Sequence, residues 1–71
     1  MSDFSEKIKA LRQEKGVTQK AVAEYLGIFE QAYQKYEYGH HEPNHAITVK
    51  LADYFGVTTD YLLGRTDNNR I

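Results

Sequence analysis

The segment from Thr18 to Gly39 constrains the fold more than any other part of this 71-residue chain. Two amphipathic helical patterns meet there at a single glycine, Gly27. A glycine can adopt the left-handed conformation of a sharp turn without steric cost. Apolar residues on either side recur at spacings of three, four and seven, as expected for helices that bury one face; they are Val22, Ala23 and Leu26 before the glycine, and Ile28, Tyr33 and Tyr36 after it. We therefore expect two helices joined by a tight turn.

Capping signals divide the remainder of the chain into further helices. Helices commonly begin after Ser, Thr, Asp or Asn and end at Gly. The predicted caps are Asp3, Thr18, Asn44 and Thr58, and the predicted helices end near Lys15, Leu26, Tyr38, Phe55 and Gly64. The third helix, over 29–38, begins without a polar cap. The expected fold class is all-α: a compact five-helix domain over 1–66 with a helix-turn-helix at its second and third helices, followed by a flexible C-terminal tail over 67–71.

Composition excludes several classes of protein. The chain has no cysteine, so we expect neither disulfides nor thiolate metal sites. No apolar run approaches the length of a membrane span, and the N-terminus lacks a signal-peptide core, so a cytoplasmic protein is expected. There is no Gly-rich phosphate loop and no pattern of nucleophile and base. We expect no enzymatic activity, no cofactor and no small-molecule ligand.

The second helix of a helix-turn-helix can project polar side chains into a DNA major groove. Proteins that bind DNA usually carry a basic surface, because phosphate neutralisation supplies most of their non-specific affinity. Here nine Lys and Arg stand against ten Asp and Glu, giving a formal net charge of −1. Any contact with DNA must therefore come from locally placed cations and from helix N-termini.

Three separated motifs point to a known family. The segments LRQEKGVTQKAVAEYLGI, YEYGHHEP and KLADYFGVTTDYLLG occur in this order. Together they resemble the lambda-repressor-like, or XRE-type, helix-turn-helix family of small bacterial and phage regulators, over roughly 4–64. The resemblance implies a five-helix domain that binds double-stranded DNA as a homodimer on a palindromic operator. It also implies a transcriptional regulator, most often a repressor.

The resemblance assigns roles to individual positions. Gln19 corresponds to a residue that contacts a phosphate and braces the recognition helix, and Arg12 and Glu37 correspond to an internal ion pair. Residues matching those that reach base edges are Glu30, Gln31, Gln34 and Lys35. Further candidates for phosphate contact are Lys20, Tyr38, His40, His41 and Asn44. Gln can pair with adenine, Lys with guanine and Glu with the cytosine amino group.

Two residues depart from the family pattern where the recognition helix first meets DNA. Phe29 stands where most members have Ser or Thr, which would cap the helix and touch a phosphate. Glu30 stands where many members have a non-acidic residue. Both changes leave an alternative open, in which the helix-turn-helix scaffold holds a partner protein and binds DNA weakly or not at all. Phe29 could also pack against a thymine methyl group.

The histidines and tyrosines complete the candidate residues. His40, His41 and His45 lack a convincing fourth ligand, so we expect phosphate contact rather than a metal site. Tyr33 and Tyr36 fall on the inward face, with their hydroxyls expected at its edge. We expect Tyr25 and Tyr54 to be exposed.

Overall fold

The computed structural model describes residues 3–66, and these form five helices without any strand. The helices are α1 (Asp3–Lys15), α2 (Gln19–Leu26), α3 (Glu30–Glu37), α4 (His45–Phe55) and α5 (Thr59–Leu62). The all-α prediction is therefore confirmed. The predicted third helix is one residue too long at each end, because Phe29 and Tyr38 flank α3 as its capping residues. The predicted tail over 67–71 lies outside the described residues.

Three of the predicted caps act through their side chains. Each accepts a hydrogen bond from the backbone N–H three residues ahead, which satisfies one of the unpaired donors at a helix start. The pairs are Thr18 with Ala21 (3.0 Å), Asn44 with Ile47 (2.9 Å) and Thr58 with Tyr61 (3.0 Å). The fourth prediction was wrong, because Asp3 lies within α1 and does not precede it.

The core draws one fully buried side chain from every helix. Ile8, Val22, Tyr33, Leu51 and Leu62 come from α1 to α5 in turn, and each has an exposed fraction of 0%. A domain of this size has little interior, so a single shared core must hold all five helices. Tyr33 is the largest of these side chains, and it anchors α3 in that core.

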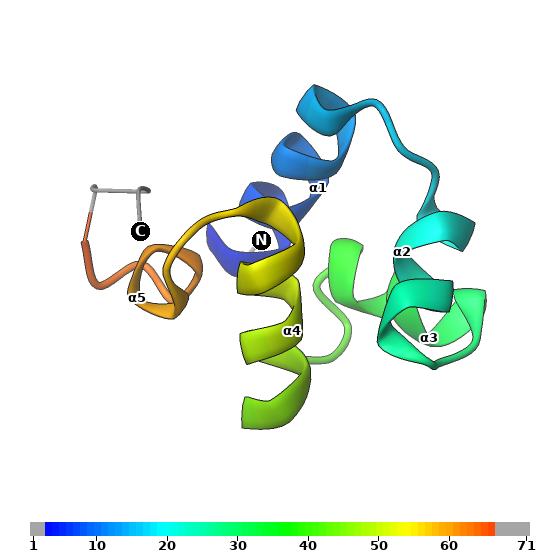
Figure 1. Ribbon diagram of the computed structural model, residues 1–71. Coiled ribbons are helices and arrows are strands. Elements are labelled where there is room, and N and C mark those ends of the chain that lie inside the picture. The colour runs from blue at the N-terminus through cyan, green and yellow to red at the C-terminus, as the bar shows by residue number, and fades with distance from the viewer. Residues whose placement is uncertain (1–2, 67–71) are drawn as a thin grey trace.

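The turn between α2 and α3 is as tight as the sequence predicts. Gly27 has a φ of +74°, in the left-handed region, and the next N–H, from Ile28, donates to the Ala23 carbonyl at 3.1 Å. Ala23 is almost completely buried (1% exposed). Figure 1 shows α2 and α3 together on one side of α4, with α5 on the other side.

Side-chain contacts join the remaining helices. Lys7 of α1 donates from Nζ to the Tyr61 carbonyl at 3.0 Å, and its ammonium lies 4.8 Å from the centre of the Tyr61 ring. The rings of Tyr25 and Tyr54 are 4.6 Å apart, which connects α2 to α4. Tyr25 is half exposed, but Tyr54 is partly buried by this contact. The prediction that both would be exposed was therefore wrong for Tyr54.

Candidate nucleic-acid interface

An ion pair at the C-terminal end of α3 fixes this helix to α1. Arg12 Nε lies 2.6 Å from Glu37 Oε2, and Arg12 Nη2 lies 3.3 Å from Oε1. Arg12 also donates from Nη1 to the Val17 carbonyl at 3.0 Å. These are the two residues that the family resemblance pairs. The two-pronged geometry constrains direction as well as distance, because guanidinium and carboxylate are both planar.

The Glu37 carboxylate is buried, with the whole residue only 4% exposed. Burial alone would raise the pKa of Glu37, since it disfavours the charged form. Hydrogen bonds from its neighbours, led by Arg12, outweigh burial and hold the pKa of Glu37 below its ordinary value. The ion pair is thus present in its charged form at neutral pH.

Tyr33 lies beside the same carboxylate. Burial, together with the neighbouring Glu37, raises the pKa of Tyr33 well above its ordinary value. Its hydroxyl is completely buried, and no described residue completes a hydrogen bond of good geometry with it. The expectation that this hydroxyl would reach the edge of the helix was wrong, because α3 packs deeply enough to cover the whole ring.

Gln19 continues the network from Glu37 toward the outside of α3. It donates from Nε2 to Glu37 Oε1 at 3.0 Å and accepts at Oε1 from Gln34 Nε2 at 3.2 Å. Gln34 also lies 3.4 Å from Glu30 Oε2, one helical turn earlier. A continuous series of polar contacts therefore runs from the ion pair to the first turn of α3. This arrangement sets the rotation of α3 about its own axis.

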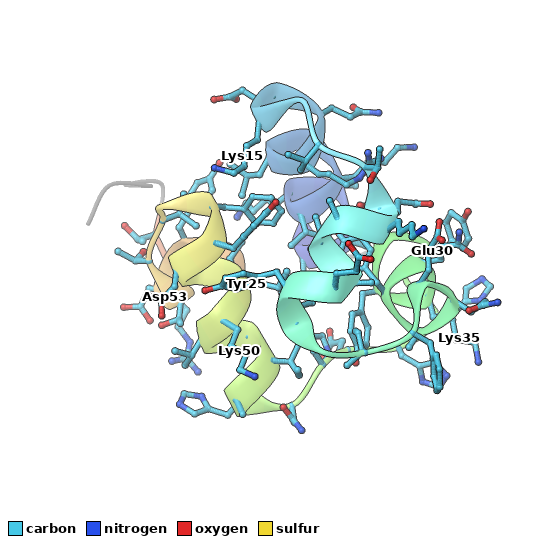
Figure 2. All side chains as sticks on the ribbon, turned by 45° about the vertical axis from the view of Figure 1, so that its right-hand side comes forward. Lys15, Tyr25, Glu30, Lys35, Lys50 and Asp53 are labelled. Carbon is cyan, nitrogen blue, oxygen red and sulfur yellow. The ribbon has the colours of Figure 1, made fainter. Side chains whose placement is uncertain are left out.

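The four candidate base-reading residues divide into two pairs. Gln31 and Lys35 are exposed. Figure 2 shows Lys35 extending outward from α3. Glu30 and Gln34 are partly buried and held in the network described above. The structure thus brings all four onto one helix, but leaves two of them with much less freedom.

The sequence did not reveal that Gln34 is turned toward α2. Its spacing of four from Glu30 is a signal of a same-face contact. Contact with Gln19, in contrast, depends on how α2 and α3 cross, which the local pattern does not specify.

The candidate phosphate contacts lie in two places. Gln19 and Lys20 are in the first turn of α2, and the others follow α3 in the connection to α4. The Tyr38 and His40 rings are 6.1 Å apart, and both residues are exposed. His41 is exposed as well, as is Asn44, whose Oδ1 caps α4 while its amide group remains a donor. Hydrogen-bond donors therefore lie in the segments that precede and follow α3 in the chain.

Phe29 is an apolar residue among the polar side chains of the candidate DNA-contacting surface. Its side chain makes no capping hydrogen bond, and it is 82% exposed. Together with Gly27, Ile28 and Ala32 it lines an open, mainly apolar depression of about 470 Å³. The first turn of α3 thus presents an apolar surface where a polar cap would ordinarily lie.

Two further observations bear on the class of protein. Within residues 3–66, no group of three or more His, Cys, Asp and Glu side chains is placed to hold a metal ion. None of the helices in this part of the chain has the length and apolar character needed to cross a bilayer.

The fold and this network define the chain as a lambda-repressor-like helix-turn-helix domain. A family model described as helix-turn-helix matches residues 8–62, and the chain belongs to this family. The resemblance given by the sequence motifs is therefore confirmed. The family and its named relatives are transcriptional regulators rather than enzymes, in agreement with the sequence-based expectation.

Individual relatives give the same result. The chain is 44% identical over 63 residues to the SPbeta prophage-derived HTH-type transcriptional regulator YonR of Bacillus subtilis (strain 168), covering 89% of this chain and 58% of YonR. It is 37% identical over 68 residues to the HTH-type transcriptional regulator YqaE of the same organism, covering 96% and 59%. The chain thus spans somewhat more than half the length of these relatives.

A solved structure has a very similar fold. The crystal structure of the P22 c2 repressor protein in complex with a synthetic operator aligns with a TM-score of 0.85 and 26% identity. The alignment covers 93% of this chain and 100% of the repressor chain.

Proposed function

We propose that this chain is a sequence-specific DNA-binding regulator that represses transcription by inserting α3 into the major groove of a palindromic operator. The observation that carries the proposal is the polar network from Arg12 through Glu37 and Gln19 to Gln34. It holds α3 in a fixed orientation and leaves Gln31 and Lys35 directed outward. Similarity to a repressor solved with its operator supports the same conclusion.

The chemistry of each side chain suggests which part of the DNA it would contact. Gln31 would pair with an adenine and Lys35 would donate to a guanine, while Glu30 would accept from a cytosine amino group. Gln34 would contribute through its carbonyl oxygen, because its amide nitrogen is engaged by Gln19 and Glu30. Phosphate contacts would come from Gln19, Lys20, Tyr38, His40, His41 and Asn44. As a regulator of bacterial transcription, the protein would act in the cytoplasm.

The proposed homodimer would place two copies of α3 in successive major grooves, about one helical turn of DNA apart. The surface near α5 supports this proposal. Leu63 is 48% exposed although it is large and apolar, and Tyr61 beside it is partly exposed. Sedimentation of the wild type and of Leu63→Glu tests the assignment. A dimer that Leu63→Glu converts to a monomer supports it, and an unchanged dimer would place the interface elsewhere.

Selection of binding sites from random DNA, followed by a salt titration, tests the proposed function. We expect an enriched palindrome whose affinity falls as salt increases, because phosphate contacts release counterions. The double variant Gln31→Ala/Lys35→Ala should lose the enrichment. Lys50→Ala is a matched control for charge, since Lys50 is an exposed lysine on α4, away from α3 (Figure 2).

The protein-interaction module is the second candidate function. The high exposure of Phe29 and the formal net charge of −1 favour it. Absence of any enriched DNA sequence at low salt would reject the regulator and leave this alternative.

A further inference from the structure

The apolar surface at the start of α3 has no role in the hydrogen-bonding network beneath it. Phe29 is 82% exposed, and the depression that it lines with Gly27, Ile28 and Ala32 is mainly apolar. The backbone of Phe29 has the extended conformation of an N-cap residue. A phenylalanine side chain, however, cannot accept a hydrogen bond from the backbone N–H groups of the first helical turn, as a capping side chain does. Helix stability therefore does not account for a phenylalanine at this position.

The position of the depression follows from helix geometry. Successive residues of an α-helix lie about 100° apart around its axis, so residues four apart share a face. Gln31 and Lys35 define the outward face of α3. Gln34 borders this face on the side that contacts α2. Ala32 borders it on the other side, and the depression is therefore continuous with the proposed base-reading surface.

A DNA major groove offers little apolar surface. The base-pair edges in it present hydrogen-bond donors and acceptors, and the exception is the C5-methyl group of thymine, which apolar side chains such as Phe and Ala can contact. The apolar depression beside the outward face of α3 therefore has one chemically matched occupant in DNA.

We propose that Phe29, with Ile28 and Ala32 beside it, is a specificity-determining residue that contacts the C5-methyl group of a thymine in each operator half-site. The inference rests on the proposed DNA-binding function and extends it to a named base feature. It also explains the departure from a serine or threonine cap, because the position gives up a capping hydrogen bond and a phosphate contact and gains a base contact.

Deoxyuridine substitution isolates the methyl group. Deoxyuridine pairs as thymine does but lacks the C5-methyl, so each thymine of the selected operator is replaced in turn. For the wild type we expect about fourfold weaker binding at one thymine per half-site, the factor that one buried methyl group typically contributes. Phe29→Ala and Phe29→Ser should bind the thymine and deoxyuridine operators equally, whereas Phe29→Leu should keep part of the difference.

The readout is the ratio of the two dissociation constants for each variant. Phe29→Ser serves as the folding control, because serine restores a helix cap. A ratio that is the same in the wild type and in Phe29→Ala would overturn this inference and leave the proposed function intact. Loss of binding to both operators by all three folded variants would also overturn it, since Phe29 would then be a general contact. If the wild type selects no DNA sequence, the proposed function itself fails.

Discussion

Gln34 donates from its Nε2 to the Oε1 of Gln19 at 3.2 Å, and this hydrogen bond links the outer part of α3 to the first turn of α2. Gln19 in turn contacts Glu37, which is paired with Arg12 in the interior. Interior packing and the proposed DNA-contacting surface are therefore parts of one network. Substitutions within it should alter both stability and the orientation of α3.

Loss of Arg12 should be strongly destabilising. Arg12→Met removes the partner of a buried carboxylate, and an uncompensated buried charge typically costs about 3–5 kcal/mol. Urea denaturation measures the change in the free energy of unfolding. Arg65→Met is the control, because Arg65 and Asp60 lie 3.8 Å apart on the surface and are both well exposed. Such pairs contribute at most about 1 kcal/mol. Equal effects of the two substitutions would contradict a structural role for Arg12.

Stability should decrease in acid because of Glu37. The pKa of Glu37 is lower in the folded protein than its ordinary value of 4.5, so the unfolded chain binds a proton first as the pH falls. The contribution of Glu37 is complete above pH 4.5 and is lost as the pH falls through the folded-state pKa. Unfolding free energies measured from neutral pH downward should show a steeper decrease for the wild type than for Glu37→Gln. Parallel curves would assign the acid sensitivity to other carboxylates.

A polar cap at position 29 should stabilise the isolated protein. Phe29→Ser can accept a hydrogen bond from a backbone N–H in the first turn of α3, whereas Phe29→Ala cannot. We expect Phe29→Ser to exceed Phe29→Ala in unfolding free energy by about 1 kcal/mol. Thermal and urea denaturation of the two variants provide the comparison. Equal unfolding free energies would mean that water already satisfies the free backbone N–H groups in the first turn of α3.

Local features of the fold could be predicted from the sequence, whereas contacts between helices could not. Thr18, Asn44 and Thr58 cap their helices through neighbours three residues away, so a short stretch of sequence determines each one. The inward direction of Gln34 and the burial of the Tyr33 hydroxyl depend on how closely α2 and α3 pack. The replacement of a polar cap by Phe29 could be seen in the sequence, but the exposure of Phe29 and the depression that it lines with Ala32 required the three-dimensional structure.

The three histidines near the end of α3 should contribute general rather than base-specific affinity, because contacts to phosphates carry no sequence information. His40 and His41 are exposed in the connection after α3, and His45 is exposed at the start of α4. Replacing all three with Gln should weaken binding to the selected operator and to unrelated DNA by a similar factor, while the fold is retained. Dissociation constants measured at constant ionic strength test this. Unchanged dissociation constants in the triple variant would exclude these histidines as phosphate contacts.

Lys35 should provide base-specific rather than general affinity. It is exposed on the outward face of α3, and a lysine there can donate to the acceptor edge of a guanine. Lys35→Ala should weaken binding to the selected operator by about 1–3 kcal/mol and relax the preference at one base position. Competition binding against operators changed at each position measures both effects, with Lys50→Ala as the control for loss of charge. If Lys35→Ala weakened binding equally on all sequences, Lys35 would be a phosphate contact, and Gln31 would remain as the main base-reading residue.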